Sequence, residues 1–544
     1  MKFIIIPGLL ALVASSALAD VVYNVVGYPD TEKGAFGVVI NNKLTPLTTT
    51  EATFPLWSAN VVGASSSSGY RYVKLNDAGT IIDKEKFLRR IAVSKAKNTP
   101  NEFFQRQNTF ATYPALPQVY PSVRPKPSKA FDDTQIATIH LTADPAVFAD
   151  MVANPLDTER KAIKASFRFI NADTVYNAAE VKVKVSGHGS RKFKKLSLRV
   201  KFDEDKNETF FDRPIIKLRS SSSEPTFIRE KLYIDNLNAI GARTTQAAWV
   251  RVYVNNKPFG FHLLVEDIET PFLRGTFHDG AALKDKEMGS LYQMGSHVIG
   301  QEGTMIYTGP LTADYNPEVY SNKNVGSANT KEEPMAQFIA FMKDLQEYDP
   351  TLANGLKFWN SRLNVDEFLK FMVMEYLTGA WDGSWWKGNN FFMYFHPTQA
   401  RWQFISTDFD STFSDGERAD VAVPYKQFAA SRLRRQGKDH PLVSKLILKN
   451  KEINKEFEKI LGAAVKQVFN PAVLEPRIAA YEKFIEAEAA WDFSLDRSKN
   501  PGKDPKYTID TFHKSLTGPV TGITYGVKPW IKYRATDVPK QLKK

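Results

Sequence analysis

The chain has 544 residues, a formal charge of +12 and no cysteine. The absence of cysteine excludes disulfides, thiolate metal sites and cysteine nucleophiles, so a buried core must stabilise the fold. The length provides apolar residues for one or two domains. A basic surface can bind nucleic acid, anionic polysaccharide or acidic proteins. The positive residues are spread out, with one local cluster at 432–438, and we expect no nucleic-acid partner.

Residues 1–19 have the pattern of a secretory signal peptide. Lys2 gives a positive start, residues 3–14 are apolar, and residues 17–19 form a small-x-small cleavage site. A membrane anchor is the alternative, but the apolar stretch is short for one. No other apolar run is long enough to span a bilayer, so we expect a soluble exported protein without a transmembrane segment in the mature chain.

Residues 20–112 are predicted to form a small all-β domain. Short runs of Val, Ile, Tyr and Phe, at 21–26, 36–40 and 70–75, alternate with clusters of Gly, Ser, Asn and Thr. The following stretch, 113–130, contains five prolines and is predicted to be an extended linker.

From residue 131 to residue 544 the pattern predicts a β-rich half followed by a helical half. Strands are expected at 136–143, 164–172, 180–190, 196–202, 214–220, 249–256 and 260–268. Apolar residues at helical spacing predict helices at 226–242, 335–348, 365–381, 454–469 and 472–491. A mostly β lobe before a mostly α lobe predicts an α+β fold with a cleft between the lobes, a usual place for a ligand.

Several common catalytic signatures are absent. The sequence has no Walker A loop and no HExxH motif. Its eight histidines do not cluster along the chain, which disfavours a zinc site and a Ser-His-Asp hydrolase.

A pair of aspartates follows the apolar segment WQFISTDF. Asp408 and Asp410 would project to the same side of a strand, where two carboxylates repel unless one is protonated or a cation lies between them. Asp382, Asn389 and Asn390 precede the neighbouring strand, and such oxygens suit Mg²⁺ or Mn²⁺ carrying nucleotide phosphates. The alternative is that the two aspartates are turn or cap residues.

Two upstream features could contact a nucleotide. The turn SGHGSRKFKK, residues 186–195, could place backbone N–H groups around phosphates, although ordinary hairpin turns also contain Gly and Lys. Lys217 lies on a strand before the helix that carries Arg229 and Glu230. Protein kinases hold a phosphate-binding lysine with a helix carboxylate in this way, whereas an exposed charge at a sheet edge is the alternative.

These segments resemble the spore coat protein H (CotH) kinase family. The resemblance is carried by IKLRSSSSEPTFIREKLYIDNLNAIGA and VRVYVNNKPFGFHLLVEDI within 215–270, and by EYLTGAWDG, NNFFMYFHP and WQFISTDFDSTF within 370–416. It is closest to the secreted, cell-surface CotH proteins of mucoralean fungi and covers nearly the whole mature chain. It implies an atypical protein-kinase-like fold with a β-rich N-lobe and a helical C-lobe over 131–544, preceded by the small all-β, sandwich-like domain.

The resemblance also implies ATP as cofactor, with Mg²⁺ or Mn²⁺, and the transfer of phosphate to serine. By position it makes Asp382 the catalytic aspartate. The metal ligands would be Asp408, Asp410 and Asn390. Cofactor contacts would come from the nucleotide loop, the strand lysine and the inter-lobe hinge: Gly187, Gly189, Ser190, Lys217, Glu266 and its neighbour Asp267. Glu230 is the expected partner of Lys217, with Arg229 and Glu224 as competing candidates.

The expected substrates are Ser-rich secreted or coat proteins, and the expected location is the spore or the cell surface or wall, reached through the secretory pathway. Because the serine-rich tail and lipid-anchor signal of surface members are not found, we expect secretion or wall retention. Fungal members are also described as invasins, so an adhesin that binds host receptors on a kinase scaffold without turnover is the alternative. A third possibility is a spore-wall structural protein, which would bind no nucleotide.

Overall fold

The computed structural model describes residues 19–64, 69–90, 97–123, 128–203, 208–281, 283–284, 287–296, 298, 300–416, 421–428 and 440–543. Apart from Ala19, the expected signal peptide lies outside these residues, and so does the basic cluster at 432–438. The chain divides into two compact units. One comprises the residues up to Thr109 together with Phe169–Tyr176, and the other comprises Phe110–Arg168 and the residues from Asn177 onward.

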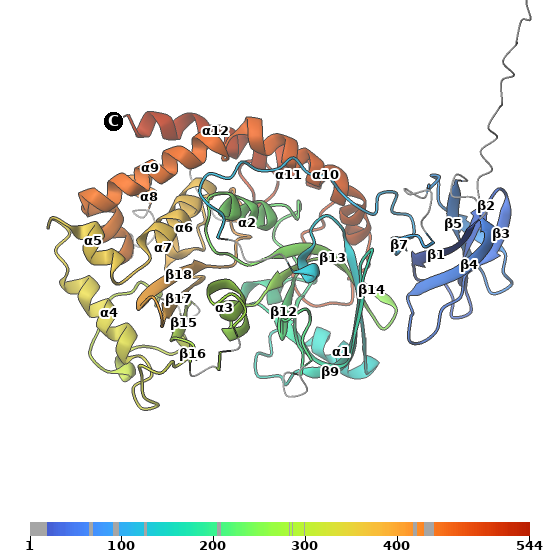
Figure 1. The fold of residues 1–544 in the computed structure, drawn as a ribbon, viewed down its shortest axis with the longest axis horizontal. Coiled ribbons are helices and arrows are strands. Elements are labelled where there is room, and N and C mark those ends of the chain that lie inside the picture. The colour runs from blue at the N-terminus through green and yellow to red at the C-terminus, as the bar shows by residue number, and fades with distance from the viewer. Residues whose placement is uncertain are drawn as a thin grey trace, which may run out of the picture. The chain divides into compact units, whose positions relative to one another are not determined.

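The first unit contains two sheets (Figure 1), with strand orders β4-β1-β7 and β3-β2-β5-β6. Its strands are β1 Ala19–Val26, β2 Ala35–Ile40, β3 Lys43–Pro46, β4 Leu56–Ala64, β5 Tyr70–Leu75, β6 Ile81–Lys84 and β7 Glu102–Phe103. Alternate side chains of these strands are buried and form one core, which includes Tyr23, Phe36, Trp57, Tyr70 and Tyr72. Aromatic residues thus provide most of the volume that stabilises this unit.

The second unit begins with a closed barrel of strand order β10-β11-β12-β14-β13-β8-β9. The strands are β8 Ala137–Ala143, β9 Ile163–Ile170, β10 Val175–Ser186, β11 Ser197–Lys201, β12 Ile215–Arg219, β13 Ala247–Val254 and β14 Lys257–Glu266. One set of alternate residues, such as Val200, Ile216 and Leu264, is buried. The opposite set includes Arg199, which pairs directly with Lys217. These strands therefore have positively charged side chains on the face opposite to their apolar residues.

A second sheet and a set of helices complete this unit (Figure 1). The sheet has the order β16-β15-β17-β18, with β15 Leu291–Met294, β16 Tyr320–Asn324, β17 Phe391–His396 and β18 Arg401–Ser406. The helices are α1 Pro145–Ala153, α2 Arg229–Ala239, α3 Thr270–Phe277, α4 Ala336–Glu347, α5 Gly355–Asn360, α6 Val365–Thr378, α7 Ser384–Lys387, α8 Tyr425–Phe428, α9 Lys451–Gln467, α10 Pro471–Phe493, α11 Ile509–Thr517 and α12 Val527–Gln541, with a π-helix at Leu442–Lys449. Helix α6 packs against β18, α2 and α9, so it lies at the centre of the apolar core.

The proline-rich stretch after the first unit lies along the second. The Tyr113 ring packs edge-on against Tyr481 of α10, with the ring centroids 4.7 Å apart. The Val119 N–H donates to the Ala239 carbonyl at the end of α2, at 2.8 Å. These contacts fix the stretch along the surface of its unit.

The expected α+β class is confirmed, and the predicted strands and helices of the second unit are found. Boundaries differ by a few residues, as they do for the predicted helix 226–242, which begins at Arg229 and ends at Ala239. Phe227 has a φ of +56°, so the chain cannot be helical there. Among the described residues, none of the helices is both long and apolar enough to span a membrane.

Candidate active site

The ends of two neighbouring strands bring the candidate site residues together. In the β17–β18 pair Phe391 lies opposite Ser406, so the residue before β17 and the residue after β18 are neighbours. The Thr407 N–H donates to the Asn390 carbonyl at 2.9 Å. The Asn390 side-chain amide donates to the Asp382 carboxylate at 3.0 Å. Asp382, Asn390 and the start of the Asp408 loop therefore meet at one edge of this sheet.

Asp382 also binds a lysine that our sequence analysis did not consider. The Lys387 Nζ lies 2.5 Å from the Asp382 Oδ1, and both side chains are about one-fifth exposed. Lys387 is the last residue of α7, the short helix that follows Asp382. The short helix therefore brings Lys387 back to Asp382, five residues earlier in the chain, and the sequence DGSWWK contains both residues.

A buried glutamate holds this loop in place. Glu375 of α6 accepts N–H bonds from Ser384 at 3.1 Å and Trp385 at 2.7 Å, and the Ser406 hydroxyl at 3.1 Å. Burial raises the pKa of Glu375 to about 7, against the effect of these donors. A Cβ atom at Gly383 would lie only 2.8 Å from this carboxylate. Glu375 therefore connects the loop after Asp382 to the end of β18. In the sequence, a glutamate within an otherwise apolar helix was a signal of such a buried role, and our sequence analysis did not use it.

The central residue of the site is Arg219, at the end of β12. Its Nε donates to the Glu230 carboxylate of α2 at 2.6 Å. Its Nη2 donates to Asp408 and lies 3.0 Å from the Asp410 Oδ2. Burial acts to lower the pKa of Arg219, but the three carboxylates outweigh it and raise that pKa well above its usual value. One guanidinium thus joins the barrel, α2 and the loop after β18.

The repulsion between the two aspartates is relieved in an unsymmetrical way. Burial acts to raise the pKa of Asp408, but Arg219 outweighs it and holds that pKa below its usual value. Burial and the Asp408 charge raise the pKa of Asp410 well above its usual value. The expectation that strand alternation aligns the pair is wrong, because β18 ends at Ser406 and Asp408 has a φ of +63°. Aspartate tolerates this left-handed conformation, which is common at functional sites.

The expected pairing of Lys217 with Glu230 is wrong. The Lys217 Nζ lies 2.7 Å from the Asp267 Oδ1, and the Arg199 Nε donates to the same carboxylate at 2.7 Å. Burial acts to raise the pKa of Asp267, but the two cations lower it to about 2. The register explains the difference, because Lys217 lies opposite Val265, two residues before Asp267. The first turn of α2 instead meets the end of β12, where Arg219 lies.

The competing partners of Lys217 are also engaged elsewhere. Arg229 and Glu224 form a fully buried ion pair with each other at 2.9 Å. The arrangement therefore assigns neither of them to Lys217.

The expected contact of the Glu266 carboxylate with a nucleotide is not supported by its position. Its Oε1 lies 2.8 Å from the Arg213 Nη2, and its Oε2 accepts the Gln246 N–H at 2.7 Å. The cavity beside Glu266 and Asp267 measures about 10 Å³, room for a single water. The base of a nucleotide could bind beside Glu266 and Asp267 only if the surrounding side chains moved apart.

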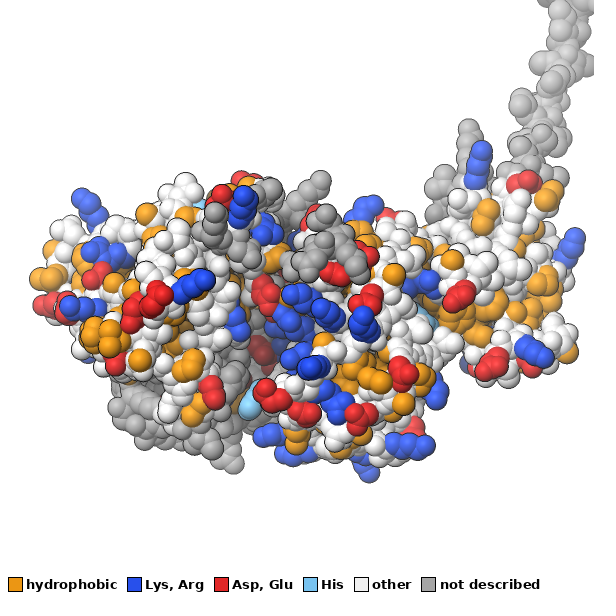
Figure 2. All heavy atoms as spheres, turned by 90° about the horizontal axis from the view of Figure 1, so that it is seen from below, with side chains coloured by type: hydrophobic (Ala, Val, Ile, Leu, Met, Phe, Trp, Pro, Cys, Tyr) orange, Lys and Arg blue, Asp and Glu red, His pale blue; other side chains and the backbone are white. Residues whose placement is uncertain are grey.

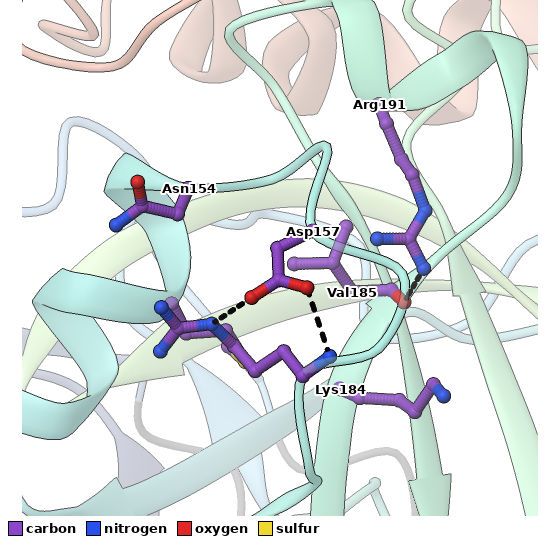
Figure 3. A pocket seen from close by; sticks show the side chains of 7 residues that line it. Asn154, Asp157, Lys184, Val185 and Arg191 are labelled. Atoms are coloured by element: carbon purple, nitrogen blue, oxygen red, sulfur yellow. Dashed lines mark hydrogen bonds and ion pairs between the residues drawn. The ribbon is translucent and has the colours of Figure 1, made fainter.

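The glycine-bearing turn is fixed from within by Arg191. Its guanidinium donates to the Val185 carbonyl at 2.6 Å (Figure 3), and also to the carbonyls of Gly187 at 2.6 Å and Pro155 at 2.7 Å. Gly187 has a φ of +86°, and a Cβ there would lie 2.0 Å from the Ser190 hydroxyl, so glycine is required. The cavity beside Arg191 is only about 10 Å³. The turn therefore has a fixed shape, with open space around the Cβ position of Gly189.

The site is accessible to solvent and rich in charge. Figure 2 shows Lys and Arg side chains gathered around a hollow on one face of the molecule, with Asp and Glu side chains inside it. The Asp408 and Asp410 side chains are 38% and 26% exposed. Within the described part of the chain, no group of three or more His, Cys, Asp or Glu side chains could hold a metal ion. The two aspartates and Asn390 could supply only part of a coordination shell of hard oxygens.

A family model and several known proteins are similar to this chain in sequence. The family model described as CotH kinase protein matches residues 183–518. Invasin CotH3 of Rhizopus delemar is 29% identical, covering 98% of this chain and 86% of that protein. Spore coat protein homolog 1 of the same organism is 26% identical, with coverages of 96% and 82%. Inner spore coat protein H of Bacillus subtilis is 23% identical over 56% of this chain and 76% of its own length. Since the family model matches more than half of the chain and includes every candidate site residue, this protein belongs to the CotH kinase family.

Proposed function

We propose that the protein is a secreted atypical kinase that transfers the γ-phosphate of ATP to serine hydroxyls of exported spore-coat or cell-surface proteins. The observation that carries the proposal is the link through Arg219. It connects Glu230 on a helix with Asp408 after a strand, beside the loop that holds Asp382 and Asn390. Protein kinases connect a strand cation, a helix glutamate and a metal-binding aspartate in a similar order.

In this proposal the two parts of the second unit act as kinase-like lobes. The barrel and α2 would form the N-lobe, and the sheet β16-β15-β17-β18 with the later helices would form the C-lobe. The segment after β14, which contains Asp267, would be the hinge. The ion pair of Lys217 with Asp267 would place this lysine towards the hinge, and Arg219 towards the phosphates. The two residues lie two positions apart on one strand face, a spacing of about 7 Å.

The donor set fits a hard divalent cation. Asp408 and Asp410 would hold Mg²⁺ or Mn²⁺, with the Asn390 amide oxygen as a further ligand. Magnesium bound with nucleotides usually takes one or two carboxylates, and phosphate and water oxygens complete its shell. When bound, the cation would neutralise charge on the phosphate oxygens. Its positive charge would also offset the repulsion between the Asp408 and Asp410 carboxylates.

The remaining chemistry belongs to side chains of this chain. Asp382 orients the serine hydroxyl and accepts its proton. Lys387, beside Asp382, and Arg219, beside Asp408, stabilise the negative charge of the phosphoryl group in transfer. Lys217 contacts the α- or β-phosphate. Catalysis in this mechanism consists of positioning and charge stabilisation.

The direct test is incorporation of labelled γ-phosphate from ATP by the purified mature chain, with Mg²⁺ or Mn²⁺. Acceptors are the chain itself and Ser-rich secreted proteins. The label is expected with the wild type and with Asp30→Ala, an exposed aspartate of the first unit that pairs with Lys74, but not with Asp408→Ala. Absence of label from the folded wild type with both metals and several acceptors would contradict the kinase proposal.

A second candidate function is adhesion without turnover. It is favoured by the match to Invasin CotH3, which covers 98% of this chain and so extends beyond the residues that the family model matches. In that case the protein would bind host-cell receptors at a spore or cell surface that it reaches by secretion. Nucleotide binding without phosphate transfer, together with saturable binding of the folded chain to host cells, would favour this function. Phosphate transfer without such binding would count against it.

A further inference from the structure

A cavity of about 370 Å³ lies outside the Asp382–Asp408 cluster. It lies between the end of the glycine-bearing turn, the loop after β12 and the segment 492–508, and none of the candidate catalytic or metal-binding residues lines it. Small-molecule sites typically measure about 300–1,000 Å³. The cavity therefore has the size of a ligand site, unlike the 10 Å³ cavities beside Arg191 and Glu266.

The wall formed by segment 492–508 is fixed by hydrogen bonds. The Lys503 N–H donates to the Lys192 carbonyl at 2.7 Å, and the Lys194 N–H donates to the Lys503 carbonyl at 2.9 Å. Further along, the Tyr507 hydroxyl donates to the Ser223 carbonyl at 2.5 Å. The segment has no helix or strand between α10 and α11, so these bonds preserve the cavity.

The backbone around the cavity is strained at several points. Ser221, Phe227 and Lys506 line it, and each has a positive φ, of 48°, 56° and 52°. Residues other than glycine, asparagine and aspartate seldom adopt this conformation, which concentrates at functional sites. The strain is an observation independent of the cavity volume.

The charges that line the cavity do not balance. Its cations are Lys194, Lys195, Arg497, Lys503 and Lys506, and its carboxylates are Asp492 and Asp504, which gives 5 − 2 = +3. The Asp492 carboxylate already forms ion pairs with Lys195 at 3.0 Å and Arg497 at 2.7 Å. Among the described residues, the Lys503 and Lys506 side chains form no ion pair. The cavity thus offers positive charge to an anion.

The uncharged part of the lining is mostly apolar, with four aromatic rings. Its apolar and aromatic residues are Phe193, Phe227, Phe493, Leu495, Pro505 and Tyr507, and three hydroxyl residues, Ser221, Ser222 and Thr508, complete it. Such a lining can contact the apolar part of a ligand, while the Lys and Arg side chains contact its anionic group. A free inorganic anion would use only part of this surface.

We propose that this cavity binds a phosphate monoester carried on an apolar or aromatic body. A phosphate monoester carries about −1.5 to −2 charges at neutral pH, which suits a lining of net +3. Lysine and arginine bind its oxygens through charge-assisted hydrogen bonds. This site does not depend on the proposed phosphoryl transfer, because binding here requires none of the candidate catalytic residues.

Two serines connect the cavity to the candidate active site: Ser222, which lines the cavity, and Ser223, which follows it in the chain. The Ser222 hydroxyl donates to Ser220, which directly follows Arg219. The Ser223 hydroxyl donates to Asp415, in the loop that begins at Asp408. An occupant of the cavity would therefore restrict both segments that carry the Arg219–Asp408 contact.

Titration calorimetry of the full mature chain with phenyl phosphate tests the site. The charge-reversal pair Lys503→Glu and Lys506→Glu is expected to weaken binding at least about tenfold. The matched pair Lys499→Glu and Lys532→Glu makes the same change of net charge at exposed positions outside the cavity and is expected to retain the wild-type affinity. Asp408→Ala is expected to retain binding too, which separates this site from the candidate active site.

Competition against phenyl phosphate identifies the source of the ligand. Displacement by AMP assigns a nucleotide, and displacement by a phosphoserine peptide assigns a phosphoprotein. The proposal is overturned if the folded wild type does not bind phenyl phosphate, or if both lysine pairs weaken binding equally. It is also overturned if Asp408→Ala abolishes binding, because the probe would then occupy the candidate active site.

Discussion

Two arginines of this molecule, Arg89 and Arg219, each contact more than one carboxylate, and the exposure of these carboxylates differs. In the first unit Arg89 contacts Glu85 at 2.7 Å and Glu102 at 3.2 Å, and the three side chains are 3%, 0% and 8% exposed. In the second unit Arg219 contacts three carboxylates, two of which, Asp408 and Asp410, are 38% and 26% exposed. The carboxylates around Arg89 are buried, whereas two of those around Arg219 are partly exposed. Of these two networks, only the one around Arg219 can therefore be reached by a ligand.

The hydrogen bonds of the two networks also differ. Glu102 accepts the hydroxyls of Tyr70 at 2.8 Å and Tyr72 at 2.9 Å, and Glu85 accepts two backbone N–H groups. In the second network one guanidinium serves three acids, which leaves an excess of negative charge. Buried charges cost stability unless they are paired and hydrogen-bonded. The buried, fully hydrogen-bonded network of Arg89 therefore indicates a structural role, whereas the exposed network of Arg219 provides the carboxylates to which the proposed cation would bind.

The largest effect is expected from Asp408→Asn. It should reduce phosphate transfer by roughly 10⁴-fold, or about 5 kcal/mol of barrier, because the proposed metal ligand would be lost. The thermal midpoint should stay the same or rise, because one of the excess charges is removed. Labelled transfer and calorimetry measure the two quantities. An active variant would show that this network has no catalytic role.

The structural network is broken by Arg89→Met. The first unit should lose roughly 3–5 kcal/mol of stability, because Glu85 and Glu102 would be left buried without their cation. Calorimetry and limited proteolysis of the full chain should show earlier unfolding of the first unit. Lys33→Met removes an exposed charge from the same unit and serves as the control. Unfolding at the wild-type temperature would contradict a structural role for this network.

A smaller effect is expected at Glu375, which holds the loop after Asp382. Glu375→Ala should lower kcat by roughly 10–100-fold, about 1.4–2.7 kcal/mol, with little change in KM for ATP. Glu375→Gln keeps one acceptor oxygen and should recover part of the rate. A change confined to KM would argue against a positioning role for this carboxylate.

The smallest effect concerns pH and has opposite signs at two carboxylates, Asp267 of the second unit and Glu102 of the first. Asp267, with a pKa of about 2 against an ordinary 3.8, binds fewer protons in the folded state. Its contribution, about 2 kcal/mol, is complete above pH 3.8 and is lost as the pH falls through 2. Burial raises the pKa of Glu102 above 4.5, so the first unit loses stability as the pH rises from 4.5. Asp267→Asn and Glu102→Gln should each flatten one limb of the stability profile, measured by denaturant unfolding.

The sequence was a good guide to the elements and a partial guide to the site. Periodicity placed the strands at 249–256 and 260–268 and the helix at 365–381, because apolar residues must repeat with the local geometry of the chain. The proximity of Asp382 and Asn390 also followed from the order of loop and strand. These inferences depend on residues that are close in sequence.

The partners of the charged residues did not follow from the sequence. Lys217 and Arg219 share one strand face and have the same charge, so only the register with β14 and the start of α2 distinguishes them. Glu375 lies in an apolar helix run, where pattern alone gives no partner for its carboxylate. The link between Arg219 and Asp408 spans 189 positions of the chain.

By itself the sequence determined the α+β class, the order of strands and helices, the resemblance to CotH kinases and the acids around Asp382 and Asp408. Only the tertiary structure decided that Arg219 joins those acids, that Asp267 takes Lys217, and that segment 492–508 encloses a cationic cavity. The physical reason is range. Helix and strand patterns arise between neighbours, whereas ion pairs and cavities form between segments that meet only when the core packs.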